Sequence, residues 1–158
     1  MSNTAEETTS VRKEVVVPAS PEFAFEVFTA RFGDWWPGHH LSAGAVEAYV
    51  LEPGEGGRWF ERTVEGEECE WGRVLHWEPP RRLVLSWGIS AAWEADPALA
   101  SEVEVTFEPT GDGTRVVLEH RHLDRAGEGW REMREEVGGD GGWGAILGGY
   151  LRLVESAA

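Results

Sequence analysis

The sequence is poor in several residue types, and each shortage excludes a class of protein. Cys69 is the only cysteine among 158 residues. An intramolecular disulfide is therefore excluded, and a cysteine-based metal site is not expected. No apolar run approaches the roughly 20 residues that cross a bilayer. The first ten residues, MSNTAEETTS, lack the basic start and apolar centre of a signal peptide. We therefore predict a cytoplasmic protein.

Basic residues are scarce relative to acidic ones. The 14 Lys and Arg residues face 29 Asp and Glu residues, which gives a formal net charge of −15. Such a field repels phosphate backbones and anionic lipid headgroups. We therefore expect neither nucleic acid nor a membrane as a partner.

Tryptophan is abundant, and its role has two interpretations. The nine residues are Trp35, Trp36, Trp59, Trp71, Trp77, Trp87, Trp93, Trp130 and Trp143. Each buried indole contributes a large apolar area and one N–H that needs a partner. In the first interpretation these side chains fill a small core, which is the usual place of aromatic residues. In the second they line a cavity for a hydrophobic or aromatic ligand.

Hydrophobic patterning predicts one α+β domain over residues 11–158, after a disordered tail over residues 1–10. Val11–Val17 has the β-branched composition of a strand. Ser20-Pro21-Glu22 then has the capping and dipole preferences of a helix start, and a second short helical turn follows near Gly33. Further strands are predicted over 46–51, 57–62, 70–77, 82–87, 102–108 and 114–123.

The C-terminal segment is the most regular. Apolar side chains recur there at helical spacing, at Trp143, Ile146, Leu147, Tyr150, Leu151 and Val154. Gly144, Gly148 and Gly149 interrupt this helix, which indicates either close packing or room left for something else. Because no helices alternate with the strands, the pattern favours an antiparallel sheet of about six or seven strands. The long C-terminal helix should lie on that sheet.

Several motifs in order give the chain a family resemblance. They are Pro18–Phe28, Trp35-Trp36, EPGEGGRWF at 52–60, Gly72-Arg73-Val74, Glu78–Leu83, Ser86-Trp87, Gly113–Val116 and Gly142-Trp143. Together they resemble the homologues of the heat-shock-protein-90 ATPase activator, which belong to the START-like SRPBCC superfamily. The resemblance implies a helix-grip fold, in which a curved antiparallel sheet encloses the C-terminal helix and two short helices follow the first strand. The family name also carries an association with stress response.

The resemblance also implies where a ligand would be held, namely between the sheet and the C-terminal helix. The residues expected there are Phe28, Trp35, Trp36, Trp59, Arg73, Leu85, Trp87, Val105, Phe107, Leu118, His120, Trp143, Leu147, Tyr150 and Leu151. The segment from Phe28 to His40 would form the entrance. Arg73 belongs to this set only if its strand turns it inward, where a guanidinium could hold a carboxylate.

Few residues indicate chemistry. His120 and His122 share one face of a predicted strand, and His39-His40 could add a third ligand, but no carboxylate is placed by spacing to complete a metal site. We predict no metal and no cofactor. His120 and Tyr150 are the only acid–base candidates. Glu61 could act as an acid only if it is buried.

We therefore predict a non-catalytic protein that binds a hydrophobic or aromatic small molecule. Fold-level analogy leaves two alternatives open. One is a protein-interaction module related to chaperone activation, with a protein partner or a second copy of the chain. The other is an enzyme of the cyclase or aromatase type.

Overall fold

Seven strands form one antiparallel sheet in the computed structural model, which describes residues 8–157. The strands are β1 (Val11–Val17), β2 (Val46–Leu51), β3 (Arg58–Thr63), β4 (Glu68–Glu78), β5 (Arg82–Trp87), β6 (Ser101–Pro109) and β7 (Thr114–Arg121). Their order in the sheet is β1-β7-β6-β5-β4-β3-β2. All the neighbours run antiparallel, as predicted.

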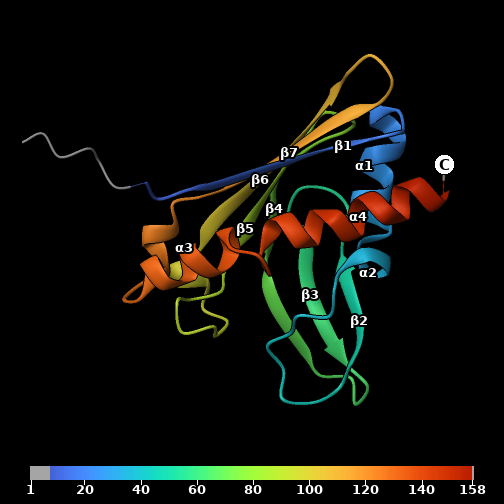
Figure 1. Cartoon of the computed structure of the whole chain (residues 1–158). Coiled ribbons are helices and arrows are strands. Elements are labelled where there is room, and N and C mark those ends of the chain that lie inside the picture. Colours follow the sequence, from blue (N-terminus) through green and yellow to red (C-terminus); the bar gives the residue numbers. More distant parts are fainter. Residues whose placement is uncertain (1–7, 158) are drawn as a thin grey trace, which may run out of the picture.

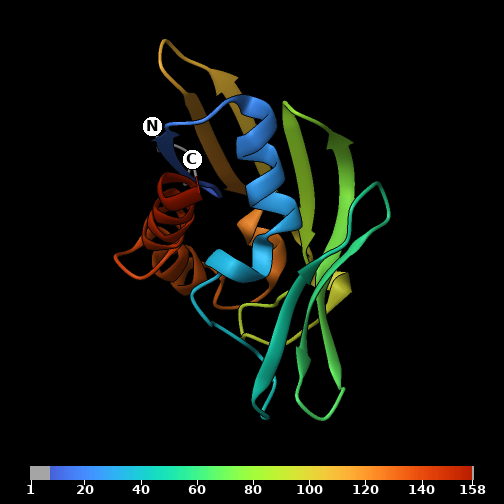
Figure 2. The same ribbon diagram turned by 90° about the vertical axis from the view of Figure 1, so that its right-hand side faces the viewer.

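The helices lie on the concave side of this sheet (Figures 1 and 2). They are α1 (Pro21–Ala30), α2 (Phe32–Trp35), α3 (Trp130–Gly138) and α4 (Trp143–Ala157), with 3-10 turns η1 (Pro97–Leu99) and η2 (Leu123–Ala126). The Ser20 side chain accepts a hydrogen bond from the Phe23 amide at 3.2 Å, which caps α1 as the sequence predicts. The curved sheet around the long α4 confirms the helix-grip fold. None of the helices in residues 8–157 is long and apolar enough to cross a bilayer.

The α3 helix was not predicted from the sequence. Its buried side chains are only Met133 and Val137, and most of its remaining residues are charged. The spacing of Trp130, Met133 and Val137 is nevertheless helical, and this signal could have identified the element. The helix matters because its C-terminal end helps to form the pocket described below.

The strand β4 changes which residues face the core along its length. Its register shifts against β3 at Trp59/Phe60 and against β5 at Val74/His76. Each shift is a bulge that breaks the period of two. Trp71 and Val74 are both buried as a result, although simple alternation would place them on opposite faces.

Arg73 lies on the outer face, so its predicted place at a cavity wall is wrong. Its side chain is 54% exposed and pairs with Glu70, with Nε 3.0 Å from the carboxylate. Because of the bulges, Trp71 and Val74 both face the core, whereas Arg73, which lies between them, faces outward.

The alternation predicted for the last two strands is confirmed up to Arg121. Val103, Val105 and Phe107 in β6 are buried, as are Leu118 and His120 in β7. The strand then ends, and His122 has a left-handed backbone with φ of 58°. The expectation that His120 and His122 share a strand face is therefore wrong.

The start of the domain differs slightly from the prediction. Residues 1–7 of the predicted tail lie outside the described residues. Within residues 8–10, the Thr9 carbonyl accepts a hydrogen bond from the Leu123 amide at 2.9 Å. The Thr8 carbonyl accepts one from Arg134 at 2.8 Å.

Candidate functional site

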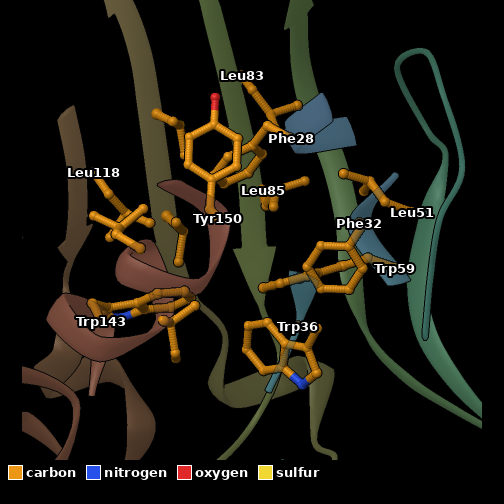
Figure 3. Packing of buried hydrophobic residues seen from close by; sticks show 14 of the residues in the cluster. Phe28, Phe32, Trp36, Leu51, Trp59, Leu83, Leu85, Leu118, Trp143 and Tyr150 are labelled. Atoms are coloured by element: carbon orange, nitrogen blue, oxygen red, sulfur yellow. The ribbon is translucent and has the colours of Figure 1, made fainter. Parts of the chain in front are cut away.

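The centre of the space between the sheet and α4 is filled by aromatic side chains. Trp59, Trp87, Trp143 and Tyr150 are each at most 5% exposed. Ring centroids lie 5.7 Å apart for Trp59 and Trp87 and 5.6 Å apart for Trp87 and Trp143. Tyr150 packs on Phe28 at 5.2 Å, and Figure 3 shows it among the core side chains with Trp143 and Trp36 below it. At this depth, therefore, the tryptophans fill the core.

His120 lies in this core as a neutral imidazole. Its Nδ1 accepts a hydrogen bond from the Trp143 indole at 3.0 Å, so its Nε2 carries the proton and donates to Ser101 Oγ at 2.8 Å. Complete burial lowers the pKa of His120 from 6.5 to about 3. Both ring nitrogens are occupied, and neither is free for a substrate.

Tyr150 is similarly occupied. Its hydroxyl donates to the Ala24 carbonyl at 2.7 Å, which ties α4 to α1. Burial raises the pKa of this phenol well above its ordinary value. The geometry of His120 and Tyr150 is therefore that of buried structural hydrogen bonds.

A pocket of about 310 Å³ opens at one end of this core. Its walls come from the segment after α2, the end of β5, the β5–β6 loop, the end of α3 and the start of α4. They are Trp36, His39, His40, Leu41, Trp87, Trp93, Glu136, Val137, Gly141, Gly142, Trp143 and Ile146. A smaller space of about 70 Å³ shares six of these walls and adds Trp71 and Ile89. We call the two spaces together the tryptophan pocket.

The predicted ligand-binding residues divide between the pocket and the core. Trp36, Trp87 and Trp143 line the pocket, and the predicted entrance from Phe28 to His40 includes the wall formed by His39 and His40. The others inside the fold belong to the hydrophobic core or lie against it and do not line the pocket: Phe28, Trp35, Trp59, Leu85, Val105, Phe107, Leu118, His120, Leu147, Tyr150 and Leu151.

Trp93 was not predicted as a site residue, yet it lines both spaces of the pocket. It is 43% exposed and has a left-handed backbone with φ of 62°. The Ser90 carbonyl accepts a hydrogen bond from the Trp93 amide at 2.8 Å, and the Ser90 amide donates one to the Glu94 carbonyl at 2.8 Å. A bulky residue at positive φ is strained, and such strain is concentrated at functional sites. The signal in the sequence is a tryptophan in an irregular, alanine-rich loop.

The buried carboxylate of Glu61 holds the wall formed by His39–Ser42. Its two oxygens accept hydrogen bonds from the amides of Leu41 at 2.7 Å and Ser42 at 2.8 Å. The Trp71 indole donates to it at 2.8 Å. Burial would raise the pKa of Glu61, but hydrogen bonds from Ser42, Leu41 and Trp71 outweigh it and hold the pKa below its ordinary value. Glu61 is thus a buried anion that anchors a pocket wall.

We expect Glu61→Gln to lower the free energy of unfolding at pH 7 by about 1 to 3 kcal/mol. The amide keeps the shape of the side chain but turns N–H groups toward donors that have lost their acceptor. The pKa of Glu61 is lower in the folded protein than in the unfolded chain. The ionised Glu61 therefore stabilises the wild type above its unfolded-state pKa, and this stabilisation is lost as the pH falls through its folded-state pKa. Urea unfolding between pH 7 and pH 3 measures both effects.

The matched control is Glu70→Gln, which removes one partner of the exposed pair with Arg73. We expect a change below about 1 kcal/mol there. Equal losses in the two variants would show that Glu61 does not anchor the wall.

A second groove, of about 930 Å³, lies along α1, from Ser20 to Ala30. Phe23, Phe25 and Trp77 line it together with Pro79 and Pro80. Phe25 and Trp77 contact each other edge to face with centroids 5.1 Å apart. This groove shares no wall with the tryptophan pocket.

The fold and its end pocket define a helix-grip domain of the SRPBCC class. Residues 18–153 match the family "Activator of Hsp90 ATPase homolog 1-like protein", and the chain belongs to this family. No curated protein matches the chain.

Two solved structures combine the fold with substantial sequence identity. The anthrahydroquino-gamma-pyrone synthase Txn09 is 42% identical, with a TM-score of 0.64, over 95% of this chain and 99% of that one. The self-sacrificing resistance protein CalC from Micromonospora echinospora is 33% identical, with a TM-score of 0.70, over 96% of this chain and 97% of that one. The Aha1 dimer from Colwellia psychrerythraea, 16% identical with a TM-score of 0.58 over 92% and 96% of the chains, shares the fold.

Proposed function

We propose that this protein binds a fused-ring aromatic small molecule in the tryptophan pocket. The observation that carries the proposal is an opening of about 310 Å³ walled by four tryptophans, Trp36, Trp87, Trp93 and Trp143. Flat indoles offer large contact areas to a planar ring system at little cost in side-chain entropy. The volume is at the lower end of the range of small-molecule sites, which suits a compact, planar ligand better than an extended lipid.

The polar residues of the pocket support the same class of ligand. His39, His40 and Glu136 line the walls, beside apolar side chains such as Leu41 and Ile146. A few polar groups around an apolar interior can orient a ligand that has oxygen substituents on an aromatic frame. The 42% identical relative is a synthase whose name describes an anthrahydroquinone fused to a pyrone, which is a ligand of this shape.

The experiment compares xanthone, a planar tricyclic γ-pyrone, with decan-1-ol, a flexible and uncharged aliphatic molecule. We expect xanthone to quench tryptophan fluorescence with saturation in the micromolar range, and decan-1-ol to bind at least about tenfold more weakly. Calorimetry under the same conditions checks the stoichiometry of one site. Absence of saturable xanthone binding by both methods would refute the proposal.

A second candidate is a reaction on such a ligand. Its support is the 42% identity to a synthase together with His39, His40 and Glu136 at the pocket wall. These groups, rather than the occupied His120 and Tyr150, are the candidates for proton transfer. His39→Gln and His40→Gln should then abolish turnover of a candidate substrate while leaving its affinity within about twofold.

The chaperone-activator alternative has less support from the surface. The exposed large apolar side chains Val16, Val64, Leu75 and Trp93 lie on separate elements rather than on one strand or helix. A partner protein ordinarily requires a contiguous patch. Stimulation of a purified chaperone ATPase by this protein would nevertheless favour that alternative.

A further inference from the structure

Trp87 carries the one buried side-chain nitrogen or oxygen in residues 8–157 that has no hydrogen-bond partner, Nε1. The other buried indoles near the pocket are paired. Trp36 donates to the His39 carbonyl at 2.9 Å and Trp143 donates to His120 at 3.0 Å. Native structures leave very few buried donors unpaired, so such a donor calls for an explanation.

None of the aromatic rings packed against Trp87 offers it a free acceptor. The ring packs between Trp59, His120 and Trp143 at centroid distances of 5.7, 4.9 and 5.6 Å. Trp59 and Trp143 are donors only. Of these three rings only His120 has an acceptor nitrogen, but its Nδ1 already accepts a hydrogen bond from Trp143 and its Nε2 donates one to Ser101. The Trp87 indole N–H is therefore left without an acceptor among these rings.

The same side chain lines both spaces of the tryptophan pocket. We propose that the ligand carries a ring carbonyl or a comparable oxygen acceptor, and that Trp87 Nε1–H donates to it. This inference rests on the proposed function and narrows it to quinone-, pyrone- and ketone-type ring systems. An indole N–H can only donate, so a purely hydrocarbon ring would leave it unpaired.

The expected effect is large for one neutral hydrogen bond. The donor has already lost its water on folding, so the ligand gains the bond without that cost on the protein side. We expect the bond to contribute about tenfold to affinity.

The test compares 9-fluorenone and fluorene, which share a planar tricyclic frame and differ in one ketone. Their affinities are measured for the wild type and for Trp87→Phe. We expect Trp87→Phe to lower the affinity for fluorenone by about tenfold and the affinity for fluorene by less than about twofold. Equal weakening of both ligands would overturn the inference.

The matched control is Trp59→Phe. The Trp59 indole donates to the Ser86 carbonyl at 2.8 Å, and it does not line the pocket. We expect a loss of stability there and an unchanged ratio of fluorenone to fluorene affinity.

An independent readout covers the case in which Trp87→Phe does not fold. In the wild type, fluorenone should move the Trp87 indole N–H proton signal downfield, and fluorene should not. A signal that moves equally with both ligands would also overturn the inference. If neither ligand binds the wild type, the proposed function itself fails, whereas binding of both without discrimination leaves the proposed function standing.

Discussion

Replacing His120 with alanine should lower the free energy of unfolding at pH 7 by about 3 to 5 kcal/mol. The change empties a ring-sized space in a core where His120 is fully buried. It also removes the acceptor of the Trp143 indole and the donor to Ser101. Urea unfolding measures the loss. His76→Ala is the control, because His76 is exposed on β4, and we expect less than about 0.5 kcal/mol there.

The same residue should make stability depend on pH. The pKa of His120 falls from 6.5 to about 3 on folding, so between these values the unfolded chain binds a proton that the folded protein does not. Acidification therefore favours unfolding, by up to about 1.4 kcal/mol per pH unit from His120. We expect the free energy of unfolding to decrease from pH 6.5 to pH 5.

The variant His120→Gln tests this assignment. An amide can replace both hydrogen bonds but does not titrate. We expect its free energy of unfolding to vary little between pH 6.5 and pH 5. An identical slope in the variant and the wild type would assign the pH dependence to other groups.

Trp93→Gly should weaken xanthone binding by about tenfold or more while leaving the fold intact or stabilised by about 1 kcal/mol. Glycine adopts the left-handed conformation of position 93 without strain. The substitution also removes one aromatic wall of the pocket. A residue that serves only the fold would not give opposite effects on stability and affinity.

Two further variants complete this comparison. Trp93→Ala removes the indole but keeps a side chain at positive φ, so it should bind as weakly as the glycine variant and be less stable. Trp130→Ala is the control for loss of an indole elsewhere, because Trp130 packs under Arg131 and does not line the pocket. Its affinity for xanthone should stay within about twofold of the wild type. Unchanged affinity in Trp93→Gly would exclude a binding role for this residue.

The sequence predicts the regular elements of this fold well because their periods are undisturbed. The strand over Val11–Val17 and the apolar stripe of the last helix are found as predicted. The glycines of that helix differ from one another. A Cβ at Gly149 would lie 3.2 Å from the Trp35 carbonyl, which explains this glycine by close packing, whereas a Cβ at Gly144 would meet nothing within 4 Å.

The pocket could be predicted only in part, because it depends on irregular structure. Trp36, Trp87 and Trp143 follow from strand alternation, helical periodicity and the family resemblance. Trp93 and His39 lie in loops that are held in part by hydrogen bonds between residues distant in sequence. In the Trp93 loop the Ala91 amide donates to the Ala126 carbonyl at 2.9 Å, and the Glu61 carboxylate accepts from the Leu41 amide 20 residues earlier. No spacing rule identifies such contacts.

The central claim is that the ligand binds in the tryptophan pocket and not in the filled core or the second groove. The most direct measurement is a ¹⁵N–¹H spectrum of the tryptophan indoles during titration with xanthone, with signals assigned by single Trp→Phe variants. We predict that the largest shifts belong to Trp36, Trp87, Trp93 and Trp143, while Trp77 and Trp130 remain unchanged. Shifts centred on Trp77, which lines the second groove, or the absence of any shift at a saturating concentration would contradict the account.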